Sequence, residues 1–218
     1  MRAITPSDIQ PKAALSLKAM FLDIFERAIL TIIFIHFAWV FLINRTIPTD
    51  VSGVLLVVGE IFPFIFILLR EPSETLSRRL SDWVLGVTGA VLPLLVTPAE
   101  THPVVPILLC YLLMISGSFV QVSAKIALGR RFGLVAANRG VVINGPYRFV
   151  RHPMYAGYTI THIGFLLAMP VALNALLYAM TLSVQVLRIM REERVLQRDQ
   201  SYVEFAKHVR YRLVPGIF

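Results

Sequence analysis

The residues best suited to chemistry lie in two polar stretches near the C-terminal end of an otherwise apolar chain. The first stretch, residues 130–157, contains Arg151-His152-Pro153-Met154-Tyr155 near its end. Proline is favoured at the first position of a helix, because its fixed φ suits the helix start and its missing N–H would be unpaired there. The free N–H groups that follow, with the positive end of the helix dipole, suit an anion such as a carboxylate or a phosphate. The pattern therefore predicts an anion-binding helix start at Pro153.

The same residues have a second interpretation. A helix that starts at a membrane surface places arginines such as Arg148 and Arg151 against lipid phosphates and a tyrosine such as Tyr155 in the headgroup layer. The local residues favour neither interpretation over the other. The non-helical connection within residues 130–157 is more informative. It exceeds the length of about 12–15 residues beyond which loops are usually functional or disordered. Aromatic residues among its arginines argue against disorder.

The second polar stretch is Arg188-Ile189-Met190-Arg191-Glu192-Glu193-Arg194. Arg188 and Glu192 are four residues apart, so they lie on one face of a helix. Such a pair is also common on the solvated part of a helix that leaves a membrane, where it contributes only a few tenths of a kcal/mol. The stretch becomes a candidate site because the chain between it and His152 forms a predicted hairpin that returns to the same side.

The elements that must position these residues are membrane helices. The chain has 218 residues, 56% of them hydrophobic and 16% charged, which is unusually apolar for a soluble domain. This composition excludes an ordinary soluble enzyme and a disordered chain. The single cysteine, Cys110, excludes an internal disulfide, and no metal-binding pattern of cysteine and histidine is present.

Apolar runs predict about six membrane crossings in an all-α, polytopic transmembrane bundle, since one crossing needs about 20 residues. The runs are Phe21 to Ile43, Val51 to Leu69, Trp83 to Val96, Val104 to Ala124 and Met154 to Leu187. The last run is too long for one straight crossing, and Pro170 interrupts it. We therefore expect a helix-turn-helix hairpin that breaks between Pro170 and Asn174, followed by a cytoplasmic C-terminal helix.

Charge predicts the orientation. Of the 21 lysines and arginines, Arg45 alone falls on the side opposite to the termini. By the positive-inside rule the N- and C-termini are cytoplasmic. The net charge of +8 is explained by orientation and by anionic lipid, so the expected partners are the membrane lipid bilayer and no nucleic acid. The predicted organisation is a lead-in over residues 1–20, four transmembrane helices over 21–126 and a catalytic region over 127–218.

The two polar stretches resemble the isoprenylcysteine carboxyl methyltransferase family and the related bacterial phospholipid methyltransferases, which are integral membrane enzymes. The resemblance covers roughly the last 90 residues, and either half of the match alone would be weak. It is carried by residues 145–157, GPYRFVRHPMYAG, and by Arg188, Glu192, Glu193, Leu196, Tyr202 and Phe205 with the closing Val214-Pro215.

The resemblance implies S-adenosyl-L-methionine as the cofactor and a lipophilic or lipidated methyl acceptor. The cofactor residues that it implies are Tyr147, His152, Pro153, Met154 and Tyr155, with Arg139, Gly140, Val141 and Val142 just upstream. The catalytic residues that it implies are Arg188 and Glu192, and a shift of one residue in the alignment would replace Glu192 by Glu193. No metal is implied. Arg188 would then clamp an acceptor carboxylate while Glu192 orients Arg188.

The identity of the acceptor stays open at this point. A carboxylate, as in isoprenylcysteine, is already ionised at neutral pH and needs no base. A phospholipid amine would need a base, for which Glu192 or Glu193 is the candidate, and a small thiol fits the same donor site.

Two other functions remain. Membrane sterol reductases have a similar C-terminal ending, here Arg212 to Phe218, and a nicotinamide-dependent activity would distinguish them. A transporter or accessory protein would instead use the intramembrane Glu60 and His36.

Overall fold

In the part of the chain that the computed structural model describes, helices are the only regular secondary structure. That part comprises residues 16–44, 76–96 and 101–218, with positions 65, 68, 69, 72 and 99, and it contains no strand. Within α1, side chains are described through position 36 and at position 39. The predicted second crossing, Val51 to Leu69, and residues 1–15 of the predicted lead-in lie outside the described residues, apart from positions 65, 68 and 69.

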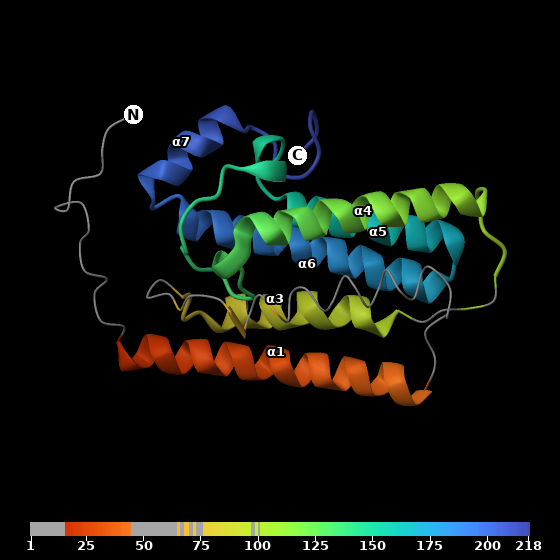
Figure 1. Cartoon of the computed structure of the whole chain (residues 1–218), viewed down its shortest axis with the longest axis horizontal. Coiled ribbons are helices and arrows are strands. Elements are labelled where there is room, and N and C mark those ends of the chain that lie inside the picture. The colour runs from red at the N-terminus through yellow and green to blue at the C-terminus, as the bar shows by residue number, and fades with distance from the viewer. Residues whose placement is uncertain are drawn as a thin grey trace.

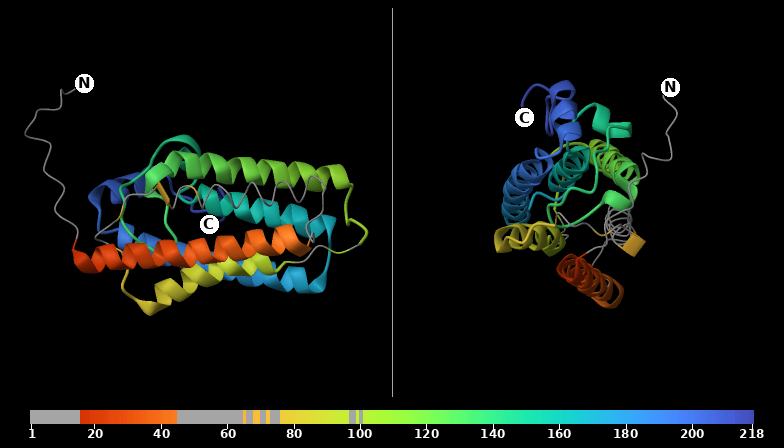
Figure 2. Two further views of the ribbon diagram at one scale, coloured as in Figure 1. Left: turned by 60° about the horizontal axis from the view of Figure 1, so that its bottom comes forward. Right: turned by 90° about the vertical axis from the view of Figure 1, so that its left-hand side faces the viewer.

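The helices run in two opposite directions along one long axis (Figure 1). The first three that the structure describes are α1 (Leu17–Asn44), α3 (Leu80–Val91), which continues into the 3-10 turn η2 (Leu92–Leu95), and α4 (Ile107–Leu128). A loop with the short turns η3 (Gly129–Arg131) and η4 (Gly145–Arg148) leads to α5 (Pro153–Ala168), α6 (Ala172–Leu196) and α7 (Gln200–His208). Figure 2 shows α5 between α4 and α6, with α1 at the edge of the bundle.

Two of the described helices are long and apolar enough to cross a membrane, residues 107–131 and 172–196. Residues 80–95 form a shorter apolar helix. The expected hairpin is present, since α5 ends at Ala168 and α6 begins at Ala172, with three residues between them that include Pro170. Asn174, expected at the break, lies inside α6. The number of crossings and the side on which the termini lie stay predictions.

Small residues let α4 and α5 pack closely. A Cβ added to Gly117 of α4 would lie 2.7 Å from the backbone oxygen of Gly157 of α5, and one added to Gly164 would lie 2.9 Å from that of Cys110. Glycines at such contacts let helix backbones approach each other, which is common between membrane helices. The helices α4 and α5 therefore pack tightly against each other. Their packing fixes the end of α4, the start of α5 and the loop between them.

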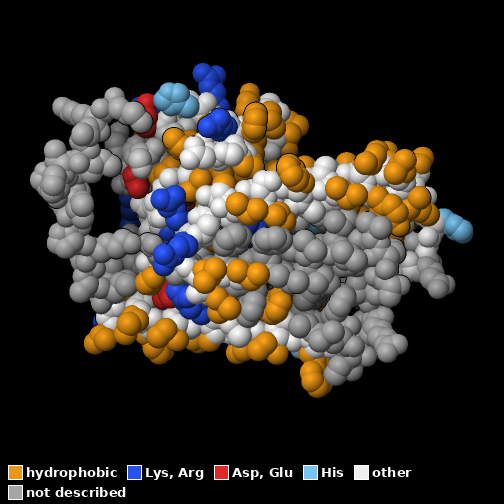
Figure 3. All heavy atoms as spheres, viewed as in Figure 1, with side chains coloured by type: hydrophobic (Ala, Val, Ile, Leu, Met, Phe, Trp, Pro, Cys, Tyr) orange, Lys and Arg blue, Asp and Glu red, His pale blue; other side chains and the backbone are white. Residues whose placement is uncertain are grey.

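Local sequence explains the helix ends near this loop. Pro153 is the first residue of α5, as predicted, and Gly129 ends α4 with a φ of +52°. Asp199 caps α7, because its side chain accepts a hydrogen bond from the Ser201 backbone N–H at 2.9 Å. Figure 3 shows Lys and Arg side chains gathered near the end of the molecule where α7 lies, while apolar side chains cover α4 and α1.

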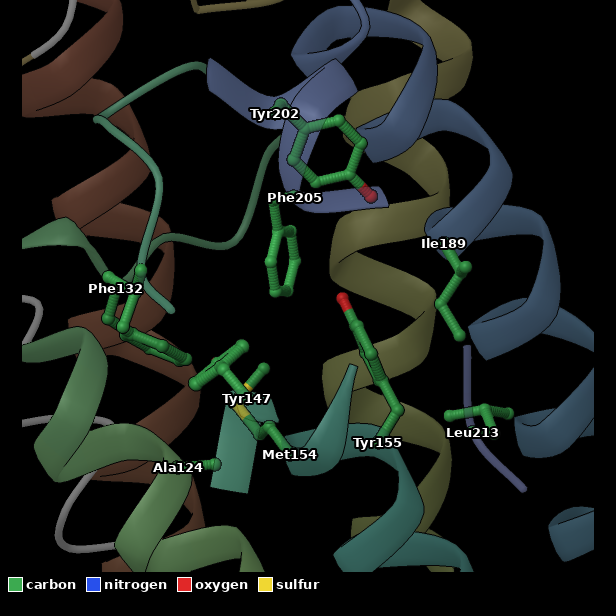
Figure 4. Packing of buried hydrophobic residues seen from close by; sticks show 10 residues of the cluster. Ala124, Phe132, Tyr147, Met154, Tyr155, Ile189, Tyr202, Phe205 and Leu213 are labelled. Carbon is green, nitrogen blue, oxygen red and sulfur yellow. The ribbon is translucent and has the colours of Figure 1, made fainter. Parts of the chain in front are cut away.

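The buried side chains at this end come from distant parts of the chain. One cluster joins α4, the loop, α5, α6, α7 and the C-terminal tail, and Figure 4 shows most of its members: Ala124, Phe132, Tyr147, Met154, Tyr155, Ile189, Tyr202, Phe205 and Leu213. Fully burying a large apolar side chain contributes about 1.5–3 kcal/mol. The cluster thus stabilises the end of the bundle where both polar stretches meet.

Candidate active site

Two adjoining cavities lie where the loop after α4 meets α5 and α6. The tyrosine cavity is lined by residues of the loop, α5, α6 and α7, among them Tyr147, His152, Glu192 and Tyr202. The arginine cavity is lined by residues of α3, the loop, α5 and α6, among them Asp82, Arg131, Arg188 and Arg191. Residues shared by both linings include Arg139, Met154, Tyr155 and Glu192. The cavities are therefore neighbours that share side chains.

The start of α5 presents backbone donors beside the tyrosine cavity. The N–H of His152 donates to the Arg212 backbone oxygen at 2.9 Å. The N–H groups of Met154 and Tyr155 have no backbone acceptor in the part of the chain that the structure describes, as expected for the first turn of a helix. Both residues are buried. Together with the helix dipole, these two donors suit the binding of an anionic group.

The loop upstream contributes backbone as well as side chains. Residues 139–142 all line the tyrosine cavity. Gly140 has a φ of +94°, which residues with a Cβ rarely adopt, and its N–H donates to the Asn138 side-chain oxygen at 2.9 Å. A Cβ there would lie 3.2 Å from Arg131 Nε. The turn therefore brings bare backbone to the cavity wall.

Two tyrosines of this cavity keep their protons. Burial raises the pKa of Tyr147 well above its usual value, and the negative charge of Glu192 adds to the effect. Burial, followed by the charge of Glu193, likewise raises the pKa of Tyr202. Figure 4 shows the rings of Tyr155, Tyr202 and Phe205 converging from α5 and α7. The cavity wall is thus aromatic, with phenol groups that stay neutral at physiological pH.

Glu193 is buried and joins three segments. Its Oε1 lies 3.2 Å from His152 Nε2 and 3.1 Å from the Tyr202 hydroxyl, and its Oε2 accepts a hydrogen bond from Arg212 Nε at 2.9 Å. Arg151 Nε forms an ion pair with Oε1 at 3.3 Å. Because a carboxylate only accepts, the proton of the 3.2 Å contact sits on His152 Nε2. Glu193 therefore fixes the ring of His152 and fastens α7 and the C-terminal tail to α6.

Glu192, the other member of the pair, faces the cavities. It lines both of them, and its Oε2 accepts a hydrogen bond from the Tyr155 hydroxyl at 3.4 Å. The alignment had left open which glutamate faces the site. The structure turns Glu192 toward the cavities and Glu193 toward the tail.

Arg188 and Glu192 do not contact each other, contrary to the expectation from the sequence. Its Nη2 donates to the Leu134 backbone oxygen at 2.9 Å, and its guanidinium carbon lies 5.5 Å from the centre of the Tyr155 ring. Among the described residues no carboxylate pairs with it. The expected orientation of Arg188 by Glu192 is therefore wrong in this structure, because the backbone of the loop supplies the partner instead.

Glu26 of α1 is a buried residue that the sequence did not suggest. Its Oε1 accepts hydrogen bonds from the backbone N–H groups of Leu134 and Val135 at 2.6 and 2.9 Å, and its Oε2 pairs with Arg139 at 3.4 Å. These contacts span more than 100 residues of sequence. The signal available in the sequence was an acidic residue inside the apolar run Phe21 to Ile43. Glu26 holds the loop that lines both cavities.

Asp82 of α3 is a second such residue. It is buried, it lines the arginine cavity, and its Oδ1 lies 3.4 Å from Arg191 Nη1 of α6. The Ser77 hydroxyl donates to its other oxygen. The ion pair ties α3 to α6 beside Arg188.

The structure brings the predicted site residues together. All the residues that the resemblance implied for the cofactor line the tyrosine cavity except Pro153, which begins α5. Arg188 lines the arginine cavity, and Glu192 lines both. Their roles stay predictions. Glu60 lies outside the described residues, and His36 is exposed on α1.

Comparison with known families adds an independent observation. Residues 105–201 match the phospholipid methyltransferase family. The family includes membrane enzymes similar to the isoprenylcysteine carboxyl methyltransferases. The enzymes of the matched family are methyltransferases, and two of the described helices are long and apolar enough to cross a membrane. No curated protein matches the chain.

The matched segment covers somewhat less than half of the chain. It runs from the start of α4 to the start of α7 and so includes the loop, Arg188 and Glu192. It leaves out α1 with Glu26 and α3 with Asp82. Two helices that hold the site thus lie outside the match.

Proposed function

We propose that the protein is an integral membrane methyltransferase that uses S-adenosylmethionine to methylate a lipid or lipidated acceptor. The family match supports methyltransferase chemistry. The observation that carries the proposal is that Tyr155 and Glu192 line both cavities. A donor in the tyrosine cavity and an acceptor in the arginine cavity would meet at these residues. Holding two reactants in line is a large part of the catalysis of such a transfer.

The tyrosine cavity offers groups that suit the carboxylate and the adenine of the donor. The free N–H groups of Met154 and Tyr155 suit a carboxylate, and the buried rings of Tyr147 and Tyr202 suit an adenine. His152, fixed by Glu193, would present its ring beside these groups. Bound there, S-adenosylmethionine would supply an electrophilic methyl group.

For the acceptor we favour a carboxylate of the isoprenylcysteine type. Arg188 donates to a backbone oxygen and has no carboxylate partner among the described residues, so its charge is available for an acid. A bidentate contact between a guanidinium and a carboxylate would orient the acceptor. A carboxylate also needs no base.

A phospholipid amine is the second candidate, and the description of the matched family favours it. A protonated amine must lose a proton before it attacks, and Glu192 is the carboxylate that lines both cavities. Tyr155, which donates to Glu192, would position that base.

The acceptor is identified by supplying the protein, in membranes, with a donor whose methyl group is isotopically labelled, followed by mass spectrometry of the products. A labelled methyl ester supports the first candidate, and labelled methylamine lipids support the second. For the second, Glu192→Gln should abolish transfer while donor binding persists. Absence of any labelled product from folded protein would overturn the proposal.

We further propose that the site and both termini face the cytoplasm, as the distribution of basic residues predicts. Cys110 is buried, so a cysteine introduced at an exposed position can be labelled selectively. Arg198→Cys, in the exposed turn between α6 and α7, should react with an impermeant maleimide only after the inner face is opened. Reaction from outside in intact cells would contradict this orientation.

A further inference from the structure

Arg188 is held in one place by contacts from three elements. Its guanidinium donates to Leu134 of the loop and lies over the ring of Tyr155 of α5. The third element is α3, where Gly89 leaves room for the Arg188 side chain. A Cβ added to Gly89 of α3 would lie 2.9 Å from Arg188 Nη1 and 3.1 Å from its Cδ. The Arg188 side chain therefore occupies a notch that exists because position 89 has no side chain.

A second glycine of α3 receives the partner of Arg188. Gly86 lies three residues before Gly89 and so on the same helix face. A Cβ at Gly86 would lie 3.1 Å from the backbone oxygen of Leu134, the atom that accepts the Arg188 hydrogen bond. Both glycines are buried. One face of α3 thus accommodates the arginine and its acceptor together.

The neighbouring arginine is held differently. Arg191 pairs with Asp82, one turn before Gly86 on α3. Along this helix, α3 neutralises Arg191 with a carboxylate and offers Arg188 only space. Arg188 therefore keeps its charge at the wall of the arginine cavity.

We propose that Gly89 is a positioning residue for the reaction, because its missing side chain seats the Arg188 guanidinium over Tyr155 at the arginine cavity. This inference rests on the proposed methyl transfer, in which Arg188 binds the acceptor. It assigns to α3, outside the matched segment, a part in recognising the acceptor.

The substitution Gly89→Ala tests the inference without weakening the helix. Alanine has a higher helix propensity than glycine. The atoms nearest to the added Cβ are Nη1 and Cδ of the flexible Arg188 side chain, followed by Val184 Cγ1 at 3.3 Å, so the fold tolerates the change while the guanidinium moves. Val84→Ala is the control, because Val84 lies on α3 with its side chain exposed.

The expected result is a specific loss in the use of the acceptor. Gly89→Ala should lower kcat/KM for the acceptor about tenfold or more, since misplacing a group by about 1 Å can cost that much. The Kd for S-adenosylmethionine should stay unchanged, and Val84→Ala should change neither quantity. In an Arg188→Lys background, which lacks Nη1, Gly89→Ala should change kcat/KM by less than about twofold. An equal loss in both backgrounds would show a role in helix packing and would overturn the inference.

A readout that does not need activity separates this inference from the proposed function. In protein labelled with ¹⁵N-arginine, the Nε resonance of Arg188 is assigned by its loss in Arg188→Lys. Gly89→Ala should shift this resonance and Val84→Ala should not, and an unshifted resonance would overturn the inference. A shifted resonance in a protein without methyl transfer would uphold the seating of Arg188 and reject the proposed reaction.

Discussion

Replacing Glu193 by glutamine probes the contact network that holds the start of α5. The glutamate side chain is 3% exposed and binds His152, Tyr202 and Arg212, with Arg151 as a further ion pair. Hydrogen bonds to a charged group contribute about 1.5–3 kcal/mol each. The Arg212 side chain is 34% exposed, so solvent screens its share. Glutamine also keeps one acceptor oxygen.

The loss should therefore be about 2 kcal/mol, which corresponds to a factor of about 30 if all of it appears in donor binding. Glu193→Gln should raise the Kd for S-adenosylmethionine by up to this factor, because His152 and the C-terminal tail lose their fixed positions. Isothermal titration calorimetry on the purified full chain gives the Kd, and thermal unfolding gives the stability.

Glu204→Gln is the matched control. Glu204 lies on α7, is exposed and pairs with Lys207 at 3.0 Å, so its loss should change neither quantity measurably. If Glu193→Gln left both the Kd and the unfolding temperature unchanged, the network would not hold the site. An equal loss in both variants would also refute the reasoning.

Two further predictions concern the loop and α7. Glu26→Gln should destabilise the protein by about 2 kcal/mol and speed hydrogen exchange of the Leu134 and Val135 amides. The reason is that a neutral amide is a weaker acceptor and leaves Arg139 less well paired. Unchanged exchange of these amides would show that Glu26 does not hold the loop. Hydrogen bonds from Ser201 and Asn138 lower the pKa of Asp199. The ionised side chain therefore stabilises α7 fully at neutral pH, and this stabilisation is lost as the pH falls below about 4. Hydrogen exchange of the α7 amides should show this loss in the native chain and not in Asp199→Asn, and identical pH profiles would contradict it.

Local features of the site were predictable from the sequence. Pro153 begins α5 because proline suits a first helical position, and the break near Pro170 follows from the same ring. Both depend on a few neighbouring residues. The convergence of the two polar stretches followed from the hairpin that joins them.

Features that depend on packing were not predictable. Glu192 and Glu193 are adjacent, so they point to different faces of α6, and only the docking of α7 and the tail decides which one faces the cavities. The spacing of Arg188 and Glu192 permits a contact. Arg188 instead donates to the Leu134 oxygen and occupies the notch at Gly89. Glu26 reaches the loop across more than 100 residues, which no local pattern encodes.

The central claim is that the tyrosine cavity binds a methyl donor. Its most direct test is equilibrium binding of S-adenosylmethionine to the purified full chain in lipid nanodiscs. The account predicts saturable binding that His152→Ala weakens about tenfold, since the substitution removes the ring fixed by Glu193, and that Val84→Ala leaves unchanged. Folded protein without saturable binding, or binding that His152→Ala leaves intact, would contradict the claim.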